Sequence, residues 1–152
     1  MEKLGQSGML PSIEKLVVNQ RMPILGICVG MQILAKSSDE GKCSGLGWID
    51  ANVRKFDITS MPFGSYLPHM GWNDVEPLVD TILFKGMEHD SRFYFLHSYY
   101  FECSERKNVM AETDYGGLFS CAAFKHNIYG VQFHPEKSHH YGSQLLKNFS
   151  EI

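Results

Sequence analysis

This 152-residue chain has two apolar segments that are followed by residues able to support nucleophilic catalysis. Cys28 comes after the apolar run 23–25, inside Gly-Ile-Cys-Val-Gly, and a helical pattern begins directly after it. This is the sequence form of a nucleophile elbow, a sharp strand-to-helix turn that exposes the nucleophile between small neighbours. His134 and Glu136 follow the second apolar segment, 128–133. A thiol, an imidazole and a carboxylate can act as nucleophile, general base and the group that orients the base.

The elements that would position these residues mix helices with strands, which predicts an α/β fold in one domain over residues 1–152. The apolar periodicity predicts an early helix, a buried strand before Cys28 and a helix after it that runs to about residue 38. Downstream, short apolar runs separated by turn residues predict strands and a hairpin. The predicted helices are 11–18, 29–38 and 142–149, and the predicted strands are 23–27, 48–53, 93–96, 109–113, 119–124 and 128–133.

Composition and charge argue against several classes of function. The net charge of −3 produces no field that would favour nucleic acid or an anionic membrane. The chain has no apolar run long enough to span a bilayer, and its first residues lack the pattern of a secretory signal. With 43% hydrophobic and 20% charged residues, the composition is that of an ordinary globular protein. We therefore expect a cytoplasmic protein that binds neither nucleic acid nor membranes.

The remaining cysteines and histidines give no metal-binding pattern. Four cysteines occur and none forms a Cys-x-x-Cys pair, which favours a reducing compartment. Cys43, Cys103 and Cys121 are interpreted as small apolar packing residues. The adjacent histidines at 139–140 have no cysteine at a ligand spacing, so solvated loop histidines are the better interpretation. We expect no metal and no cofactor.

Five segments in the same order carry a family resemblance that covers nearly the whole chain. Residues 26–32 and 130–138 resemble class I (triad) glutamine amidotransferases. Segments 68–73, 93–99 and 145–149 narrow this to the glutaminase subunits of imidazole glycerol phosphate synthases. The resemblance implies a flavodoxin-like, three-layer α/β fold with a mixed central sheet.

The resemblance also implies catalytic roles. Cys28 would attack the side-chain amide of glutamine, and His134 would take the thiol proton and pass it to the leaving ammonia. Glu136 would hold His134 in the productive tautomer. The backbone N–H of Val29 would supply one oxyanion donor. We also expect the start of the following helix and the neighbouring imidazole to lower the pKa of Cys28.

Two further sets of positions match the family. Those that would hold the glutamine substrate are Gln32, His97, Ser98 and Tyr99. The alternative for this set is polar packing beside a strand end, and it carries most weight for His97. Those that would face a partner subunit are Trp72, Asn73, Tyr94 and Lys137. The alternative there is a structural turn at 71–73 and a solvated lysine. The implied partner is a (β/α)8-barrel cyclase, which receives ammonia for histidine biosynthesis in a heterodimer.

One departure from the family concerns the N-terminus. The family begins with a strand, a helix and a second strand that ends in a Pro-Gly loop, and that loop gives the second oxyanion donor. This chain starts after it, so we expect an N-terminally truncated domain with an open sheet edge and little turnover of its own.

Alternative functions stay open on the sequence. One is a sister amidotransferase that supplies ammonia for the amidation of a bacterial surface sugar. Another is a catalytically incomplete subunit that only binds the barrel. Peptidase or γ-glutamyl hydrolase chemistry is disfavoured by the Pro-His-Met-Gly-Trp-Asn segment, residues 68–73.

Overall fold

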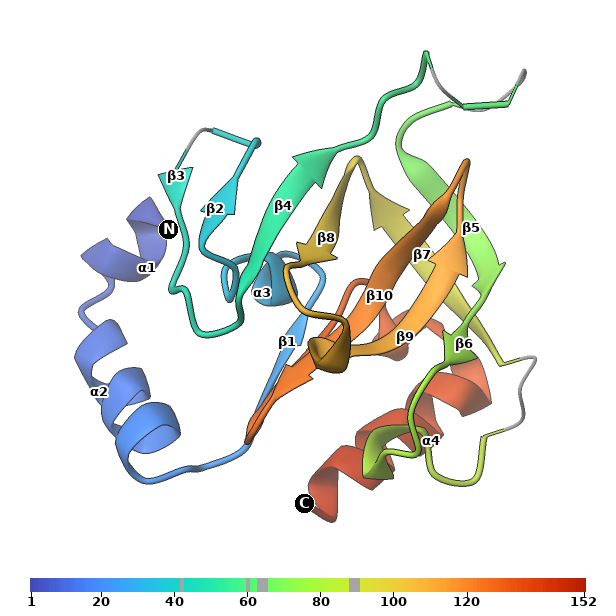
Figure 1. The fold of residues 1–152 in the computed structure, drawn as a ribbon. Coiled ribbons are helices and arrows are strands. Elements are labelled where there is room, and N and C mark those ends of the chain that lie inside the picture. Colours follow the sequence, from blue (N-terminus) through green and yellow to red (C-terminus); the bar gives the residue numbers. More distant parts are fainter. Residues whose placement is uncertain (42, 60, 63–65, 88–90) are drawn as a thin grey trace.

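The computed structural model describes residues 1–41, 43–59, 61–62, 66–87 and 91–152 (Figure 1). Within these residues a central mixed sheet is ordered β1-β11-β10-β8-β4-β2-β3, and β9 and β6 extend it from β10. Its strands are β1 (Ile24–Ile27), β2 (Ser37–Ser38), β3 (Cys43–Ser44), β4 (Ala51–Lys55), β6 (Glu76–Pro77), β8 (Tyr99–Cys103), β9 (Val109–Asp114), β10 (Leu118–Lys125) and β11 (Ile128–Val131). A separate antiparallel pair is formed by β5 (His69–Asp74) and β7 (Arg92–His97).

Helical segments connect and cover these strands. The α-helices are α1 (Glu2–Gln6), α2 (Leu10–Glu14), α3 (Val29–Gln32) and α4 (His139–Ser150). The π-helical turn η1 (Lys15–Asn19) continues α2, and the 3-10 turns are η2 (Ile82–Phe84), η3 (Arg106–Asn108) and η4 (Pro135–Lys137). Among the described residues, no helix is long and apolar enough to cross a membrane.

The sheet is mixed because two of its pairings are parallel. β1 runs parallel to β11, and β2 runs parallel to β4. The pairs that join β11 to β10, β10 to β8 and β8 to β4 are antiparallel. The predicted α/β fold with a mixed central sheet is confirmed. The parallel β1–β11 pair matters most for the site, because it brings the carboxyl ends of both strands to the same sheet edge.

Apolar side chains pack on both faces of the sheet, since successive residues of a strand point to opposite sides. Within β10, Ala122 belongs to a cluster that includes Leu145 of α4, whereas Ala123 packs with Met31 of α3 and Val17 of η1. In Figure 1 the amino-terminal helices lie at the left and α4 at the lower right. The first cluster holds α4 against one face of the sheet, and the second holds α3 and η1 against the other.

The helix after Cys28 is shorter than predicted. α3 ends at Gln32, whereas the periodicity predicted a helix to about residue 38. The carbonyls of residues 33–35, which a longer helix would use internally, instead accept hydrogen bonds from the N–H groups of Leu46, Gly47 and Ile49. Hydrogen bonds from the segment 46–49 therefore take the place of the bonds that another helical turn would make. The helix ends, and the chain continues into β2.

The other predicted elements are found with shifted ends. The helix predicted over 11–18 is divided between α2 and η1, and the strand predicted over 48–53 is β4 at 51–55. The hairpin is confirmed as the antiparallel pair β10–β11. His126 in its turn has a φ of 58°, which a tight two-residue turn requires.

Candidate active site

Cys28 occupies a strained strand-to-helix turn at the end of β1. Its φ of 51° and ψ of −110° lie in a region that a non-glycine residue seldom adopts. Hydrogen bonds on both sides hold this conformation. The Cys28 N–H donates to Val131 O at 2.8 Å, and the Cys28 carbonyl accepts from the N–H groups of Met31 and Gln32. The geometry is that of the predicted elbow.

Two glycines let the elbow pack closely. A Cβ on Gly26 would lie 2.4 Å from the carbonyl oxygen of Gly30, which is backbone and has little freedom to move. A Cβ on Gly130, in the neighbouring strand β11, would lie 2.6 Å from Cγ of Met31. The absence of these side chains allows α3 to turn directly onto β1 and β11.

His134 lies three residues beyond the end of β11, at the sheet edge that also carries Cys28. Its Nδ1 is 2.7 Å from Oε1 of Glu136, which lies in η4. A carboxylate only accepts, so Nδ1 carries the hydrogen, and in a neutral imidazole the lone pair then lies on Nε2. This is the tautomer that a general base needs.

Ser138 joins the His134 loop to β7. Its hydroxyl donates to His134 O at 2.6 Å and accepts from the Tyr94 N–H at 3.0 Å. The His134 N–H in turn donates to Tyr94 O at 2.8 Å. Ser138 is fully buried. No local sequence pattern indicated this role, because the contact with Tyr94 joins residues far apart in the chain.

The thiol of Cys28 is half-buried, and its environment differs from the one predicted. Burial is the main reason that the pKa of Cys28 is raised, not lowered. A hydrogen bond from the Val29 N–H opposes the shift, whereas the charge of Glu136 adds to it. Among the described residues, the sulfur's side-chain donor is Gln132 at 3.7 Å, and no hydrogen bond joins it to His134. Catalytic hydrogen bonds often form only once substrate is bound.

A pocket opens beside the elbow, and its lining includes an acidic residue that no sequence motif indicated. Its lining includes Val29, Gln32, Ile33, Ser38 and Glu40. A carboxylate next to the nucleophile can bind the ammonium group of an amino-acid substrate. Glu40 stands in a short polar stretch, and only the fold brings that stretch to the pocket.

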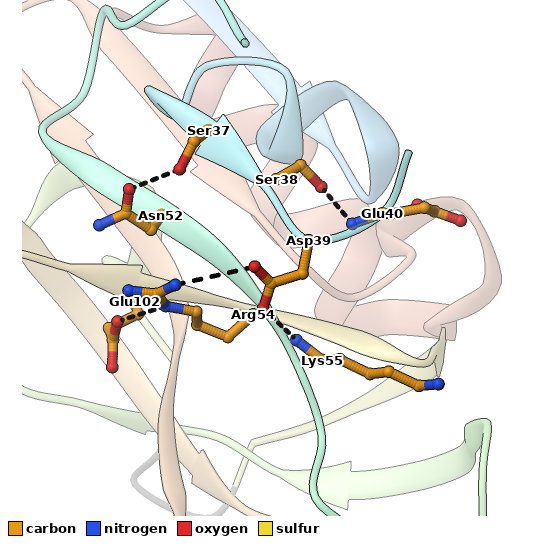
Figure 2. Close-up of polar contacts among 8 residues, drawn as sticks. All are labelled: Ser37, Ser38, Asp39, Glu40, Asn52, Arg54, Lys55 and Glu102. Atoms are coloured by element: carbon orange, nitrogen blue, oxygen red, sulfur yellow. Dashed lines mark hydrogen bonds and ion pairs between the residues drawn. The ribbon is translucent and has the colours of Figure 1, made fainter. Parts of the chain in front are cut away.

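A set of polar contacts holds the segment that carries Glu40 (Figure 2). The Glu40 N–H donates to the hydroxyl of Ser38 at 3.1 Å. The neighbouring Asp39 accepts from the Lys55 N–H at 3.2 Å and forms an ion pair with Arg54 at 3.7 Å. Arg54 also donates to Glu102 of β8 at 3.0 Å. These contacts tie the pocket wall to β4 and β8.

The four residues predicted to hold glutamine lie close together. The Nε2 of Gln32 donates to Tyr99 O at 3.2 Å, and Nδ1 of His97 lies 2.7 Å from the same oxygen. Ser98 stands between His97 and Tyr99. Both ring nitrogens of His97 have protein partners, since Nε2 lies 3.0 Å from Nδ1 of His69. This geometry fits the alternative interpretation of His97 as polar packing.

The tautomers of the two buried imidazoles follow from their partners. Tyr99 O can only accept, so Nδ1 of His97 carries a hydrogen and its Nε2 accepts from Nδ1 of His69. Nε2 of His69 then accepts from the amide of Asn73 at 3.3 Å. Both rings are therefore neutral. Burial lowers the pKa of His69 to about 3 and that of His97 to about 4.

Three of the four predicted partner-facing residues form one surface. Trp72 of β5 is paired in register with Tyr94 of β7, and its ring stacks on His139 with the centroids 5.1 Å apart. Nζ of Lys137 lies 5.6 Å from the centre of the Tyr94 ring. Asn73 differs, because its amide donates to Asp114 O at 2.8 Å and lies 3.3 Å from Nε2 of the buried His69. We name Trp72, Tyr94 and Lys137 the outer β5–β7 surface.

The described residues contain no group of three or more His, Cys, Asp or Glu side chains placed to hold a metal ion. Cys28, His134 and Glu136 supply a thiol, an imidazole and a carboxylate, the groups that nucleophilic catalysis uses.

Comparison with known proteins identifies the class. A family model described as glutamine amidotransferase class-I matches residues 3–152, and the chain belongs to this family. The imidazole glycerol phosphate synthase subunit HisH of Bdellovibrio bacteriovorus is 57% identical over 152 residues, which are 100% of this chain and 74% of that protein. The HisH subunit of Leptospira borgpetersenii is 51% identical with the same coverage. The resemblance seen in the sequence is confirmed.

Solved structures share the fold. A glutamine amidotransferase structure superposes with a TM-score of 0.67 at 20% identity, over 97% of this chain and 72% of that one. A glutamine amidotransferase from Thermotoga maritima gives a TM-score of 0.58 at 21% identity, over 89% of this chain and 50% of that one. These likenesses concern the fold alone, and they confirm the predicted amidotransferase-like architecture.

Proposed function

We propose that this chain is the glutaminase subunit of an imidazole glycerol phosphate synthase, in which it releases ammonia from glutamine for histidine biosynthesis. The observation that carries the proposal is the placement of Cys28 and His134 at one sheet edge, with Glu136 bonded to His134 Nδ1. The similarity to HisH subunits at 51–57% identity supports this pathway over the amidation of a surface sugar.

The first half of the reaction releases ammonia. Nε2 of His134 takes the thiol proton, and the sulfur of Cys28 bonds to the side-chain amide carbon of glutamine. The amide oxygen becomes an oxyanion that accepts a hydrogen bond from the Val29 N–H. His134 then gives its proton to the amide nitrogen as the carbon–nitrogen bond breaks. The products are ammonia and a γ-glutamyl thioester on Cys28.

The second half regenerates the thiol. Nε2 of His134 takes a proton from water, and the resulting hydroxide bonds to the thioester carbon. The carbon–sulfur bond breaks, glutamate leaves, and the proton returns to the sulfur of Cys28. Glu136 keeps the Nδ1 hydrogen in place and stabilises the imidazolium in both halves. The sum is glutamine and water to glutamate and ammonia.

The pocket beside the elbow supplies groups for the α-carbon end of glutamine. Glu40 would bind the ammonium group, and Gln32 would contact the substrate from α3. Tyr99 begins β8 and Ser98 precedes it, so both would lie beside Gln32 at the substrate. His97 acts indirectly in this proposal, because its two ring nitrogens already have protein partners.

The proposed partner is a (β/α)8-barrel cyclase that binds the outer β5–β7 surface. This surface carries two aromatic rings and a lysine, residue types that form strong contacts at interfaces. Two carbonyls of β7 contact the site: Leu96 O lies 3.9 Å from the Cys28 sulfur, and Tyr94 O accepts from the His134 N–H. A barrel bound there would lie next to the source of ammonia.

A glutaminase assay with the barrel subunit present tests the proposal. We expect glutamate release from the parent chain, and none above background from Cys28→Ala. Cys103→Ala, which removes a thiol distant from the elbow, serves as the matched control and should keep parent activity. Cys28→Ala with parent turnover would exclude Cys28 as the nucleophile. No turnover by the parent, although it binds the barrel, would favour the binding-only subunit.

A further inference from the structure

The side chain of Gln132 has an orientation that its neighbours determine. Gln132 follows β11 directly and is fully buried. Tyr99 O can only accept, so the nitrogen of the Gln32 amide lies on that side, at 3.2 Å. The same nitrogen donates its second hydrogen to Oε1 of Gln132 at 3.0 Å. The remaining end of the Gln132 carboxamide is therefore the nitrogen, which lies 3.7 Å from the sulfur of Cys28.

The backbone of Gln132 is held as firmly as its side chain. The Gln132 N–H donates to Cys121 O at 2.8 Å, which fixes the residue against β10. Because Gln132 is fully buried, its amide is not exposed to solvent. A series of hydrogen bonds thus runs from Tyr99 O through Gln32 to Gln132. It ends in an N–H group of Gln132 that points at the sulfur of Cys28.

We propose that Gln132 is a positioning residue for the nucleophile, which orients the sulfur of Cys28 by donating a hydrogen bond and stabilises its negative charge when the thiol ionises. This inference rests on the proposed function, and it adds the Gln132 carboxamide to the groups that act on the nucleophile. Gln132 touches the reacting sulfur and neither takes nor gives a proton during turnover.

The charges around the sulfur explain why such a donor matters. Glu136 and Glu40 both disfavour the thiolate. Burial disfavours it more strongly than either. Against these, the structure offers two neutral donors, the Val29 N–H and the Gln132 amide. In the reaction the Val29 N–H turns to the oxyanion, so the Gln132 amide is left as the donor that stays with the sulfur.

The pH dependence of alkylation by iodoacetamide tests the role of Gln132. Gln132→Met keeps a similar volume and removes the donor. We expect the apparent pKa of Cys28 to rise by about one unit, which lowers its alkylation rate below that pKa about tenfold. With the barrel present, kcat for glutamine should fall by a similar factor while KM changes little. Cys43, which is exposed, provides an internal reference thiol in each sample.

A second variant covers the case in which Gln132→Met does not fold. Gln32→Met removes the residue that orients the Gln132 carboxamide, and it should raise the apparent pKa of Cys28 in the same direction by a smaller amount. An unchanged Cys28 profile in the folded variants would overturn the proposal. An equal change at Cys43 would overturn it too, because the effect would then be global. Labelling of the parent Cys28 by a glutamine-like chloroketone separately tests the proposed function.

Discussion

At Cys28 an unusual backbone conformation is stabilised by a hydrogen bond donated to β11, by two hydrogen bonds accepted from α3, and by two glycines. Such strain persists only where the surroundings over-determine it, and it is found most often at functional sites. The close approach of Gly26 to Gly30 is the contact that allows the turn, so an added methyl group at Gly26 should disturb the elbow.

Gly26→Ala should therefore destabilise the fold. The new Cβ would lie 2.4 Å from a backbone oxygen, and overpacking of this kind costs about 1–3 kcal/mol. Gly30→Ala is the matched control, because a Cβ there meets no atom within 4 Å. Urea unfolding of both variants measures the difference. Equal stabilities would show that the elbow relaxes without strain.

His134→Ala and Glu136→Gln should separate the base from the group that orients it. Loss of the base removes a proton-transfer step worth on the order of 10²–10⁴ in rate, so His134→Ala should reduce turnover to background. Glu136→Gln keeps the shape of the side chain and should leave a measurable remainder. Steady-state glutamate release with the barrel subunit measures both. A His134→Ala variant with parent turnover would make His134 structural.

The residues that could be predicted from the sequence are those with a local signal. Cys28, His134 and Glu136 each follow an apolar strand, and glycines mark the elbow. Glu40 and Ser138 were missed, because their contacts join segments far apart in the chain. The direction of the Cys28 pKa was predicted wrongly, since burial depends on the whole fold and outweighs the nearby N–H donor.

Along β5 and β7, successive side chains alternate between an inner and an outer side of the strand pair. Trp72 and Tyr94 lie on the outer side, whereas His69 and His97 are buried on the inner side. Asn73 belongs to the inner set, although its neighbour in sequence belongs to the outer one. The family resemblance predicted a partner-facing role for both Trp72 and Asn73. The alternation of side chains along the strand shows that the two residues point to opposite sides.

Trp72→Ala and Asn73→Ala should consequently have different effects. Trp72→Ala should weaken binding to the barrel by at least tenfold, as expected for a central aromatic contact, with little change in stability. Asn73→Ala should instead lower the free energy of unfolding by about 1–3 kcal/mol, because it leaves Nε2 of the buried His69 without its donor. Titration calorimetry and urea unfolding distinguish the two. A Trp72→Ala variant with parent affinity would reject the outer β5–β7 surface.

Element boundaries were less predictable than element types. The helix after Cys28 has the periodicity of a longer helix, but carbonyls at 33–35 are used by the segment that includes Leu46 and Ile49. A tertiary contact thus ended a helix that local propensity would have continued. The hairpin β10–β11 was predicted well, because its strands and turn are contiguous in the sequence.

For the molecule as a whole, the buried pair His69 and His97 should make stability depend on pH. Their folded pKa values, about 3 and about 4, lie below the value of about 6.5 expected in the unfolded chain. The unfolded state therefore binds more protons between pH 6.5 and about pH 4, and the free energy of unfolding should fall as the pH falls through that range. Above pH 6.5 this contribution should be constant.

Urea unfolding at pH 7.5 and pH 5 tests this dependence. His69→Phe keeps a ring between Phe95 and Tyr115 and should reduce the loss of stability between the two pH values. His140→Gln, at an exposed position, should leave the loss unchanged. Equal losses in all three proteins would assign the dependence to other groups.

The position of β7 has a consequence for inhibition. Its carbonyls contact the Cys28 sulfur and the His134 backbone, while Tyr94 is not among the residues that line the pocket beside the elbow. A small molecule that binds over Tyr94 would not occupy the space of glutamine, yet it would press on the strand that both reacting groups touch. Such a compound should act non-competitively, lowering kcat without raising KM for glutamine, and its potency should be lost in Tyr94→Ala.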